Sequence, residues 1–358
     1  MDIEEKIQLI RQVGEEILTE EDLKTLLETK KHPVAYDGFE PSGRIHIAQG
    51  ILRATNVNLM LKAGCTFKMW VADWFAWMNN KMGGDIEKIR NVGQYFIEVW
   101  KACGMDTDNV QFLWSKDVMK DENYWKTAVQ IARNSTLNRI IRCSQIMGRK
   151  ETEALSAAQI FYPCMQCADI FNLKVDITQL GMDQRKVNIL ARELGPKLGF
   201  WKPVAVHHHM LMGLTQPPPN TSADKIERTI DIKMSKSNPD SAIFMDDNED
   251  EVNRKINKAY CPPNTINENP LMDYAKHLIF PNFKTMQIER DKKYGGNMEF
   301  KTFDELNQMY NTGNLHPSDL KNTVAKHINQ LLEPVRKHFQ KPKPKKILEE
   351  IRTYTITR

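Results

Sequence analysis

The sequence has no apolar run long enough to cross a membrane. Its longest apolar stretch, Val71 to Met78, is interrupted by Asp73, whereas a transmembrane helix needs about 20 predominantly apolar residues. Residues 1–31 are strongly charged and lack the apolar centre of a secretory signal peptide. We therefore expect a protein that neither enters a membrane nor is exported, and that works in the cytoplasm.

Cysteine is scarce and scattered, and we interpret the six cysteines as reduced thiols. Cys164 and Cys167 form a CxxC pair, but no second pair stands at the spacing of a zinc site. We interpret both as small packing residues rather than as a zinc or redox pair. His207, His208 and His209 are consecutive, and in a strand at most two of them face the same side. No tightly bound metal is therefore expected, and a place beside a ligand site at the end of that strand is favoured.

The composition is that of an ordinary globular protein, with 41% hydrophobic and 27% charged residues. A chain of 358 residues exceeds the usual size of a single hydrophobic core, so we expect two domains, one of them large. The net charge of +4 is spread unevenly, because residues 321–358 contain ten Lys and Arg against three Asp and Glu. A basic end suits a phosphate-backbone partner, although a solvated tail would show the same pattern.

Strands and helices alternate along the first 244 residues, after an amphipathic helix pair with Thr19 as an N-cap. Apolar patterns predict strands at residues 34–39, 66–72, 110–114, 175–180 and 203–208. Helical patterns lie between them, at residues 46–64, after 83–84, at 156–173 and at 183–198. This alternation predicts an α/β domain over residues 1–244, with a Rossmann-type, doubly wound parallel sheet.

Helical patterns dominate the rest of the chain, and no strand is expected from Glu249 onward. The longest helix is predicted from Pro317 to Phe339, and a Lys-Pro-Lys-Pro sequence at residues 341–344 is expected to close it. Residues 245–358 are therefore predicted to form a second, mainly helical domain, whose lysine-rich end is compatible with a solvated tail.

The first strand-turn-helix segment, residues 36–50, has the features of an anion site. It places His46 and Gln49 at the start of a helix that follows a parallel strand. Free backbone N–H groups and the helix dipole favour a phosphate there. Gly38 and Gly50 permit close backbone approach. Taken alone, the segment is also compatible with ordinary helix capping.

The second polar element is the sequence Lys233-Met234-Ser235-Lys236-Ser237. Two lysines and two hydroxyls on a loop can close on the β- and γ-phosphates of a nucleotide as they leave. Such a sequence can also arise in a solvated basic loop. The two elements in this order, with a βαβ pattern between them, are far more specific than either alone.

Together these elements resemble the signatures of the class I aminoacyl-tRNA synthetases. Residues 46–49 resemble the HIGH signature, and residues 233–237 match the KMSKS signature letter for letter. Ala48 and Gln49 stand where the general HIGH pattern has glycine and a second histidine. Gln49 can donate a hydrogen bond but brings no positive charge. More of the pyrophosphate charge would then fall on the two signature lysines and on a magnesium ion.

The resemblance extends in order across nearly the whole chain, to the tyrosyl-tRNA synthetases of the eukaryotic cytosolic and archaeal branch. The stretches that carry it are residues 36–50, 72–73, 162–169, 181–186, 258–262, 294–297 and 316–322. The resemblance implies a ligase that activates tyrosine with ATP and loads it onto tRNA(Tyr), with Mg²⁺ accompanying ATP.

The resemblance also implies a tyrosine pocket. The residues assigned to it are Tyr36, Asp73, Tyr162, Gln166, Asp169 and Gln184. Tyr36 and Asp169 would hold the substrate's phenolic hydroxyl, and the other tyrosine and the two glutamines would surround its α-ammonium. The spacing agrees, because Tyr162, Gln166 and Asp169 share one face of a helix. Without the resemblance, Asp169 would be interpreted as a salt-bridged acid on a helix surface.

A pocket that holds the phenol by hydrogen bonds rejects phenylalanine by leaving buried polar groups unpaired, a principle for which the tyrosine-specific synthetases are themselves the standard example. For catalysis, the resemblance implies His46, Gln49, Lys233 and Lys236 as phosphate contacts. The residues assigned to ATP are Gly38, Glu40, His46, Gly50, Met210, Lys233, Met234, Ser235, Lys236 and Ser237.

The resemblance further implies the partners of the protein. It implies a homodimer, with the segment at residues 117–153 as an insertion at the dimer interface, and a tRNA that crosses between subunits. The helical domain would read the anticodon, with His277 and Asn297 as its contacts.

Three rival functions fit parts of the pattern. The sister enzyme for tryptophan shares fold and signatures, but Asp169 with Tyr36 favours a phenol over an indole. A tRNA-binding paralogue without catalysis is opposed by the intact signature at residues 233–237. Another adenylyltransferase of the same fold, acting on a small acid, is opposed by the basic helical end.

Overall fold

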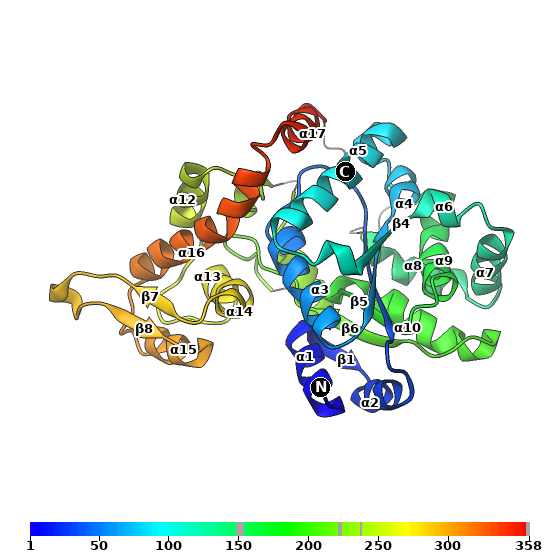
Figure 1. Cartoon of the computed structure of the whole chain (residues 1–358), viewed down its shortest axis with the longest axis horizontal. Helices are drawn as coiled ribbons and strands as arrows, with labels where there is room; N and C mark the ends of the chain where they lie inside the picture. Colours follow the sequence, from blue (N-terminus) through cyan, green and yellow to red (C-terminus); the bar gives the residue numbers. More distant parts are fainter. Residues whose placement is uncertain (148–153, 221–223, 237, 356–358) are drawn as a thin grey trace.

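The computed structural model describes residues 1–147, 154–220, 224–236 and 238–355. Among these, six strands form a central sheet in the order β1-β6-β5-β2-β3-β4 (Figure 1). The bounds are β1 (Gly14–Leu18), β2 (Val34–Phe39), β3 (Thr66–Val71), β4 (Val110–Trp114), β5 (Ile177–Gly181) and β6 (Val204–His208). All neighbouring pairs are parallel except β1 with β6. The predicted Rossmann-type α/β fold and its five parallel strands are confirmed.

Strand β2 lies at the centre of this sheet. The chain places β3 and β4 on one side of it, and β5 and β6 on the other. In open α/β sheets, ligands bind beyond the carboxyl ends of the strands where the strand order reverses. The topology therefore locates a ligand site beyond Phe39 of β2 and Gly181 of β5.

The antiparallel edge strand β1 was not predicted from the sequence. It separates the two predicted N-terminal helices, α1 (Ile3–Val13) and α2 (Glu20–Thr29), and Thr19 caps α2 as expected. The strand is only five residues long, and its backbone pairs with β6, nearly two hundred residues further on. Gly14 permits this approach, since a Cβ there would lie 2.9 Å from Val206. Such pairing leaves no local signature.

Helices cover both faces of the sheet. The predicted helix 46–64 begins as a wide π-helical turn, η1, and continues as α3, while Ser156 caps the predicted helix α9 with a capping box. The helical elements of this part are η1 (Ala48–Leu52), α3 (Arg53–Lys62), α4 (Asp73–Met78), η2 (Lys81–Gly84), α5 (Ile86–Ala102), η3 (Thr107–Asn109), α6 (Ser115–Val118), α7 (Glu122–Arg133), α8 (Leu137–Cys143), η4 (Ser144–Met147), α9 (Ala157–Asn172), η5 (Met182–Gln184), α10 (Arg185–Leu194), η6 (Pro196–Leu198), α11 (Lys225–Ile232) and η7 (Pro239–Ser241).

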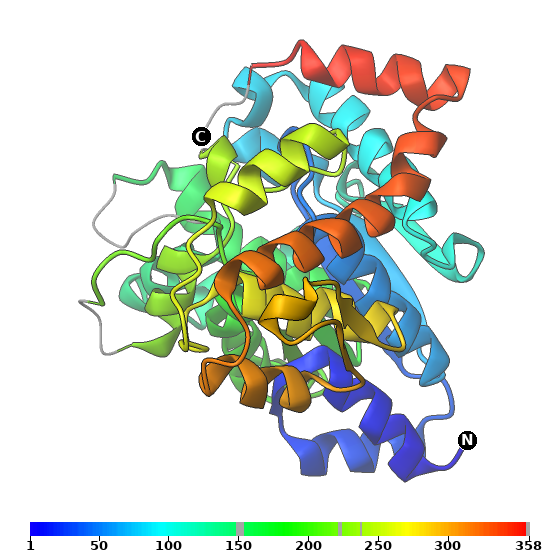
Figure 2. The same ribbon diagram turned by 90° about the vertical axis from the view of Figure 1, so that its left-hand side faces the viewer.

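The C-terminal part is mainly helical, as predicted, and lies to one side of the sheet (Figures 1 and 2). Its long helix α16 runs across the front of Figure 2. The elements are α12 (Glu249–Lys258), α13 (Pro270–Tyr274), η8 (Ala275–Ile279), α14 (Phe280–Asn282), η9 (Lys292–Tyr294), α15 (Phe303–Asn311), α16 (Pro317–His338) and α17 (Pro342–Arg352). None of the helices in the described ranges is long and apolar enough to cross a membrane.

One expectation for this part was wrong. A hairpin of β7 (Met286–Ile288) and β8 (Met298–Phe300) interrupts the helices. Each strand has three residues, too few for a two-residue periodicity to be recognised. The long helix α16 ends at His338, just before the Lys-Pro-Lys-Pro sequence, as expected. The lysine-rich end is not only a solvated tail, because Pro342 is the first residue of α17, a position where proline is favoured. That helix packs against α5, and Tyr354 bonds to Asn91.

The hydrophobic core does not divide at residue 244. One cluster of buried apolar side chains runs from α1, α3 and α5 into α12, α13 and α16, while a second surrounds α7, α9 and α10. Backbone bonds also join Ile243 and Met245 to residues 45–47 of the first part. The proposed boundary between residues 244 and 245 thus crosses a continuous core, and it stays a prediction.

Candidate active site

A cavity of about 310 Å³ opens beyond the carboxyl ends of β2, β5 and β6, at the position that the topology predicts. Most of the side chains proposed from the sequence line it. These are Tyr36, Gly38, Glu40, His46, Gln49, Tyr162, Gln166, Asp169, Gln184, Met210, Lys233, Met234 and Lys236. The cavity has one end lined by aromatic residues and one lined by lysines, and we describe them in turn.

At the aromatic end, Asp169 is 1% exposed and projects from α9 toward Tyr36 of β2. The hydroxyl of Tyr124 donates to its Oδ1 at 2.9 Å. Burial raises the pKa of Asp169 well above its usual value, and the Tyr124 bond opposes this. Burial, and then the charge of Asp169, also raise the pKa of Tyr36 well above 10, so Tyr36 remains a neutral phenol that can donate.

Beside this pair, polar side chains from α9 and η5 form a chain of hydrogen bonds. Gln166 donates to Gln184 at 3.0 Å, and Gln184 donates to the carbonyl of Ile146 at 3.0 Å. Tyr162 donates to Oε1 of Glu40 at 2.6 Å. These bonds fix the amides, so that their remaining polar atoms are oriented before a ligand arrives.

Glu40 connects the two ends of the cavity. Its Oε1 accepts from Asn79 at 2.6 Å as well as from Tyr162. Burial raises the pKa of Glu40, whereas the charge of Lys81 and the bonds from Tyr162 and Asn79 lower it. The carboxylate is thus held by two neutral donors and faces the lysines at the other end.

At the lysine end, the segment carrying His46 is fixed by backbone pairing with Phe244 and Ile243. Burial lowers the pKa of His46 well below 6.5, and the charge of Lys236 lowers it further, so the imidazole is neutral. Its Nδ1 and the Oε1 of Gln49 are buried without a hydrogen-bond partner among the described residues. Buried polar atoms of this kind are usually satisfied, so they indicate a place for a polar ligand.

Residues 233–236, the described part of the second signature, fold over this end. Met234 donates its backbone N–H to Leu211, which places both lysines at the cavity. The Nζ of Lys233 lies 2.7 Å from Oδ2 of Asp183, and Lys236 donates to Ser42 at 3.1 Å. Burial, with the charges of Lys81 and Arg53, lowers the pKa of Lys236 to about 7, against the effect of Glu40.

Several cavity residues were not predicted. Tyr124 of α7 lies outside the lining and reaches the cavity only through its bond to Asp169, to which no sequence signal connects it. Asp37 and Arg53 form a buried ion pair, with Oδ2 and Nε 2.6 Å apart, and Asp183 pairs with Lys233. Burial raises the pKa of Asp37 to about 6, although Arg53 opposes it. Asp37 lies within the family-like stretch 36–50, and Asp183 lies within the stretch 181–186. Their position in these stretches is the signal that could have marked them as candidates.

Asp73 is a correction to the predicted tyrosine pocket. The structure places it outside the cavity lining, fully buried at the start of α4. Its carboxylate accepts from Arg90 at 3.1 Å, from Ser115 at 2.5 Å and from the backbone N–H of Lys116 at 3.1 Å. The side chain therefore joins α4, α5 and α6 and has a structural role.

Three further residues differ from expectation. Gly50 does not line the cavity, and a Cβ there would overlap Met245, so it serves packing. Ser235 also lies outside the lining, where its carbonyl accepts from Ser241. His277, expected at the anticodon, instead stacks on His209, which lines the cavity. Ser237 lies outside the described residues.

The cysteines and histidines are mostly structural. All six cysteines are free thiols, and Cys164 and Cys167 are buried in α9, in agreement with a packing role. His207 contacts Glu16 and Asn188, while His208 lines the cavity and bonds to Gln179 at 2.6 Å. Burial lowers the pKa of His208 to about 3, so it is neutral.

Replacement of Asp73 tests its corrected role. In Asp73→Asn, an amide NH₂ can face the guanidinium of Arg90, and the charge-assisted bonds are lost. The free energy of unfolding should fall by about 2 kcal/mol, as measured by urea denaturation. Affinity for tyrosine, the ligand that the resemblance implies, should be unchanged. Asp169→Asn, in the cavity, should instead lower the affinity for tyrosine more than it lowers the free energy of unfolding. A tenfold loss of tyrosine affinity in Asp73→Asn would return Asp73 to the predicted tyrosine pocket.

The lowered pKa of Lys236 predicts unusual reactivity. The rate at which an acetylating reagent modifies Lys236 should rise with pH, with a midpoint near pH 7. For N-α-acetyl-lysine the midpoint of the same reaction should lie at about pH 10.4. Phosphate groups favour the charged amine, so ATP should raise the midpoint and protect the side chain. Peptide mass spectrometry across pH 5–11 measures this. A midpoint near that of the free amino acid, unchanged by ATP, would contradict the prediction.

Comparison with known proteins places this site in a family. The family model described as tRNA synthetases class I (W and Y) matches residues 28–333. The chain is 52% identical over 361 residues to tyrosine–tRNA ligase 1, cytoplasmic, of Arabidopsis thaliana, which covers 100% of this chain and 90% of that protein. It is 42% identical over 378 residues to tyrosine–tRNA ligase of Thermococcus sibiricus, with 100% of each protein covered.

Solved structures agree with the sequence matches. The crystal structure of tyrosyl-tRNA synthetase complexed with L-tyrosine from Pyrococcus horikoshii superposes with a TM-score of 0.91 at 38% identity, covering 98% of this chain and 100% of that chain. By sequence and by fold, the chain belongs to the class I tRNA synthetases, in the family of the tyrosine–tRNA ligases.

Proposed function

We propose that this cavity is where L-tyrosine and ATP react to give tyrosyl-adenylate, from which tyrosine passes to the 3′-terminal ribose of tRNA(Tyr). The observation that carries the proposal is the polarity of the cavity. A buried carboxylate with tyrosine hydroxyls, Asp169 with Tyr36 and Tyr124, lies at one end, and the lysines of the 233–237 loop lie at the other. An amino acid with a phenol ring and a nucleotide with phosphates need these two environments.

The phenol of the substrate would enter between Tyr36 and Asp169. Its hydroxyl would donate to the carboxylate and accept from the neutral Tyr36. Phenylalanine would leave both groups unpaired in a buried site, which costs the full desolvation of each. An indole N–H can donate but cannot accept, so tryptophan would leave Tyr36 without a partner.

The α-ammonium of the substrate would lie against Gln166, Gln184 and Tyr162. The hydrogen bonds among these side chains supply oxygen atoms at fixed positions. The substrate carboxylate would then be directed toward the lysine end, where ATP binds. Positioning of the two reactants is the main contribution that a protein makes to such a reaction.

In the first step, a carboxylate oxygen of tyrosine attacks the α-phosphorus of ATP, and the bond to the bridging oxygen of pyrophosphate breaks. Lys233 and Lys236 stabilise the negative charge on the leaving group. His46 and Gln49 contact the phosphates as neutral groups, so most of the positive charge comes from the loop. Lys233 is paired with Asp183 in this structure. To contact a phosphate, it must leave that carboxylate, so its side chain would move when ATP binds.

Mg²⁺ would enter with ATP rather than bind to the protein beforehand. Among the described cavity residues, each carboxylate already has partners: Asp37 with Arg53, Asp183 with Lys233, Asp169 with Tyr124, and Glu40 with two donors. A magnesium ion is usually held by substrate phosphates together with one or two carboxylates. It would supply further charge stabilisation at the phosphates.

In the second step, the terminal ribose hydroxyl of tRNA(Tyr) attacks the acyl carbon, and AMP leaves. The C-terminal part, residues 245–358, would bind the anticodon stem. Its hairpin β7–β8 projects away from the sheet and carries Tyr294, which is 63% exposed, near Asn297 (Figure 1). An exposed aromatic ring beside Lys292 and Lys293 suits stacking on an unpaired base.

The proposed homodimer would use the face formed by α4, α7 and α8. Large apolar side chains are exposed there, including Trp77 at 50%, Val129 at 48% and Leu137 at 61%. The two residues from α7 and α8 belong to the segment 117–153 that the sequence predicts at the interface, although residues 148–153 lie outside the described part. Large apolar side chains left exposed in this number are what an interface would cover.

A cytoplasmic location is proposed on the name of one relative. The Arabidopsis protein with 52% identity is named a cytoplasmic enzyme. Translation of cytosolic messages would require charged tRNA(Tyr) in that compartment.

The activation step is tested by exchange of labelled pyrophosphate into ATP, with tyrosine, phenylalanine and tryptophan as parallel substrates. Exchange with tyrosine alone is expected, because only tyrosine satisfies both Asp169 and Tyr36. Exchange with tryptophan would show that the aromatic end is misinterpreted. No exchange with any of the three, from folded protein saturated with ATP, would favour a tRNA-binding protein without catalysis.

Removal of the Tyr36 hydroxyl should relax the choice between tyrosine and phenylalanine. In Tyr36→Phe, kcat/KM for tyrosine should fall about tenfold, the value of one buried hydrogen bond, while that for phenylalanine should not fall. Tyr95→Phe is the matched control, since Tyr95 is fully buried but lies outside the cavity. Equal losses for both amino acids in Tyr36→Phe would mean that the hydroxyl does not contact the substrate phenol.

A further inference from the structure

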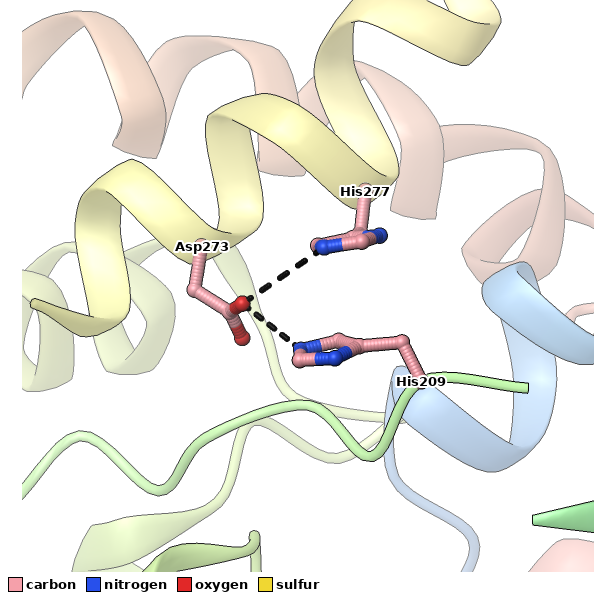
Figure 3. Close-up of side chains that lie close together, drawn as sticks. All are labelled: His209, Asp273 and His277. Atoms are coloured by element: carbon pink, nitrogen blue, oxygen red, sulfur yellow. Dashed lines mark hydrogen bonds and ion pairs between the residues drawn. The ribbon is translucent and has the colours of Figure 1, made fainter. Parts of the chain in front are cut away.

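Beside the cavity, three side chains that the proposed reaction does not use meet at one point (Figure 3). His209 follows β6, Asp273 lies in α13, and His277 lies four residues later in η8. Nε2 of His209 is 2.7 Å from Oδ1 of Asp273, and Nε2 of His277 is 3.8 Å from the same oxygen. One ligand atom from each residue lies within 4.8 Å of the other two.

The surroundings of this cluster resemble the outer shell of a metal centre. Nδ1 of His209 contacts Oε2 of Glu15 at 3.0 Å, and the backbone N–H of Met212 donates to Oδ2 of Asp273 at 2.9 Å. Histidines that bind metals usually bond through their other nitrogen to a carboxylate, and ligating carboxylates are themselves hydrogen-bonded. Both features are already in place here. They orient Nε2 of His209 and Oδ1 of Asp273 toward one another.

We propose that His209, Asp273 and His277 form a binding site for a divalent transition-metal ion, with Zn²⁺ as the best match. Two imidazoles and one carboxylate are a recurring ligand set for Zn²⁺, with bond lengths of about 2.0–2.2 Å. The two rings now stack, with centroids 3.9 Å apart and planes 11° apart. One ring must therefore rotate so that both Nε2 atoms converge on the ion.

Access and charge both favour a cation. The side chains are 22%, 11% and 23% exposed in the order of the sequence, so an ion can reach the cluster from solvent. Burial lowers the pKa of His209, but Asp273 and Glu15 raise it to about 9 overall, so an ion would displace a proton from this ring. Once both imidazoles are neutral, Asp273 and Glu15 give the site two negative charges, which a divalent ion balances. Lys276 is a nearby opposing charge. A fourth ligand position would be left for water, as in zinc sites that are not purely structural.

A bound ion would connect the catalytic end to the helical part. His209 lines the substrate cavity, and its neighbour Met210 is one of the residues assigned to ATP. Asp273 and His277 belong to the C-terminal helices. The ion would therefore hold the segment after β6 against α13 and η8, and it would stabilise the native state by binding it selectively.

The test uses the full-length, tag-free protein after EDTA treatment and dialysis, with Co²⁺ as a spectroscopic probe and Zn²⁺ as a competitor. We expect one Co²⁺ per chain, visible d–d absorption without a thiolate band, displacement by Zn²⁺, and a rise in Tm. Asp273→Asn and His277→Gln should each weaken binding more than about tenfold. His32→Gln, at an exposed histidine far from the cluster, should bind as the unchanged protein does.

Folding of the variants is checked by their Tm without metal, and Asn at position 273 retains an oxygen for the N–H of Met212. Affinity should also decrease from pH 8 to pH 6, because protons compete for the imidazoles. The proposal is overturned if Co²⁺ fails to bind, if a thiolate band shows that cysteines hold the ion, or if the two cluster variants bind as tightly as His32→Gln. Each of these measurements is independent of amino-acid activation.

Discussion

The reversal of strand order at β2 is the constraint on which this structure depends. Because β3 and β4 continue on one side of β2 and β5 and β6 on the other, the connections after β2 and β5 diverge beyond their carboxyl ends. The opening between them is the cavity. Tyr36 and Gly38 reach it from β2, His208 reaches it from β6, and α9 supplies Asp169 from above the gap. A different strand order would disperse these side chains over separate parts of the sheet.

Within that opening, most of the buried charges have partners before any substrate binds. Asp37 is paired with Arg53 and Asp183 with Lys233, while Asp169 and Glu40 accept from neutral hydroxyl or amide groups. An unpaired charge in such a site would cost several kcal/mol. The exception is Lys236, whose pKa of about 7 reflects burial near two other cations. The negative phosphates of bound ATP would raise the pKa of Lys236 again. The amine would then be protonated and positively charged at neutral pH.

The helical part is joined to the catalytic part by more than the chain. Arg44, close to His46, contacts both Asp246 and Asp247 at 2.8 and 3.0 Å. Lys255 in α12 is buried against the same Asp247 at 2.6 Å. The histidine cluster around Asp273 makes a second connection on the other side of the cavity. One hydrophobic core runs beneath these contacts, so the cavity and the hairpin β7–β8 belong to a single packed body.

Local patterns identified the parallel sheet and most of the cavity. Short apolar runs located β2 to β6, and the spacing of Tyr162, Gln166 and Asp169 placed all three on one face of α9, where they line the cavity. The signatures at residues 46–49 and 233–237 located the lysine end. Each of these features depends only on residues that lie close together along the chain. Such features can be recognised without a structure.

Pairings between distant residues had to come from the tertiary structure. β1 exists because its backbone meets β6, and the hairpin β7–β8 is too short to have a period of its own. Tyr124 contacts Asp169 across 45 residues, and Arg90 with Ser115 removes Asp73 from the pocket. The sequence by itself determined the fold class and the family. The tertiary structure decided which carboxylates face the cavity and which are held in the core, because burial and the choice of partner depend on contacts between segments that no local pattern encodes.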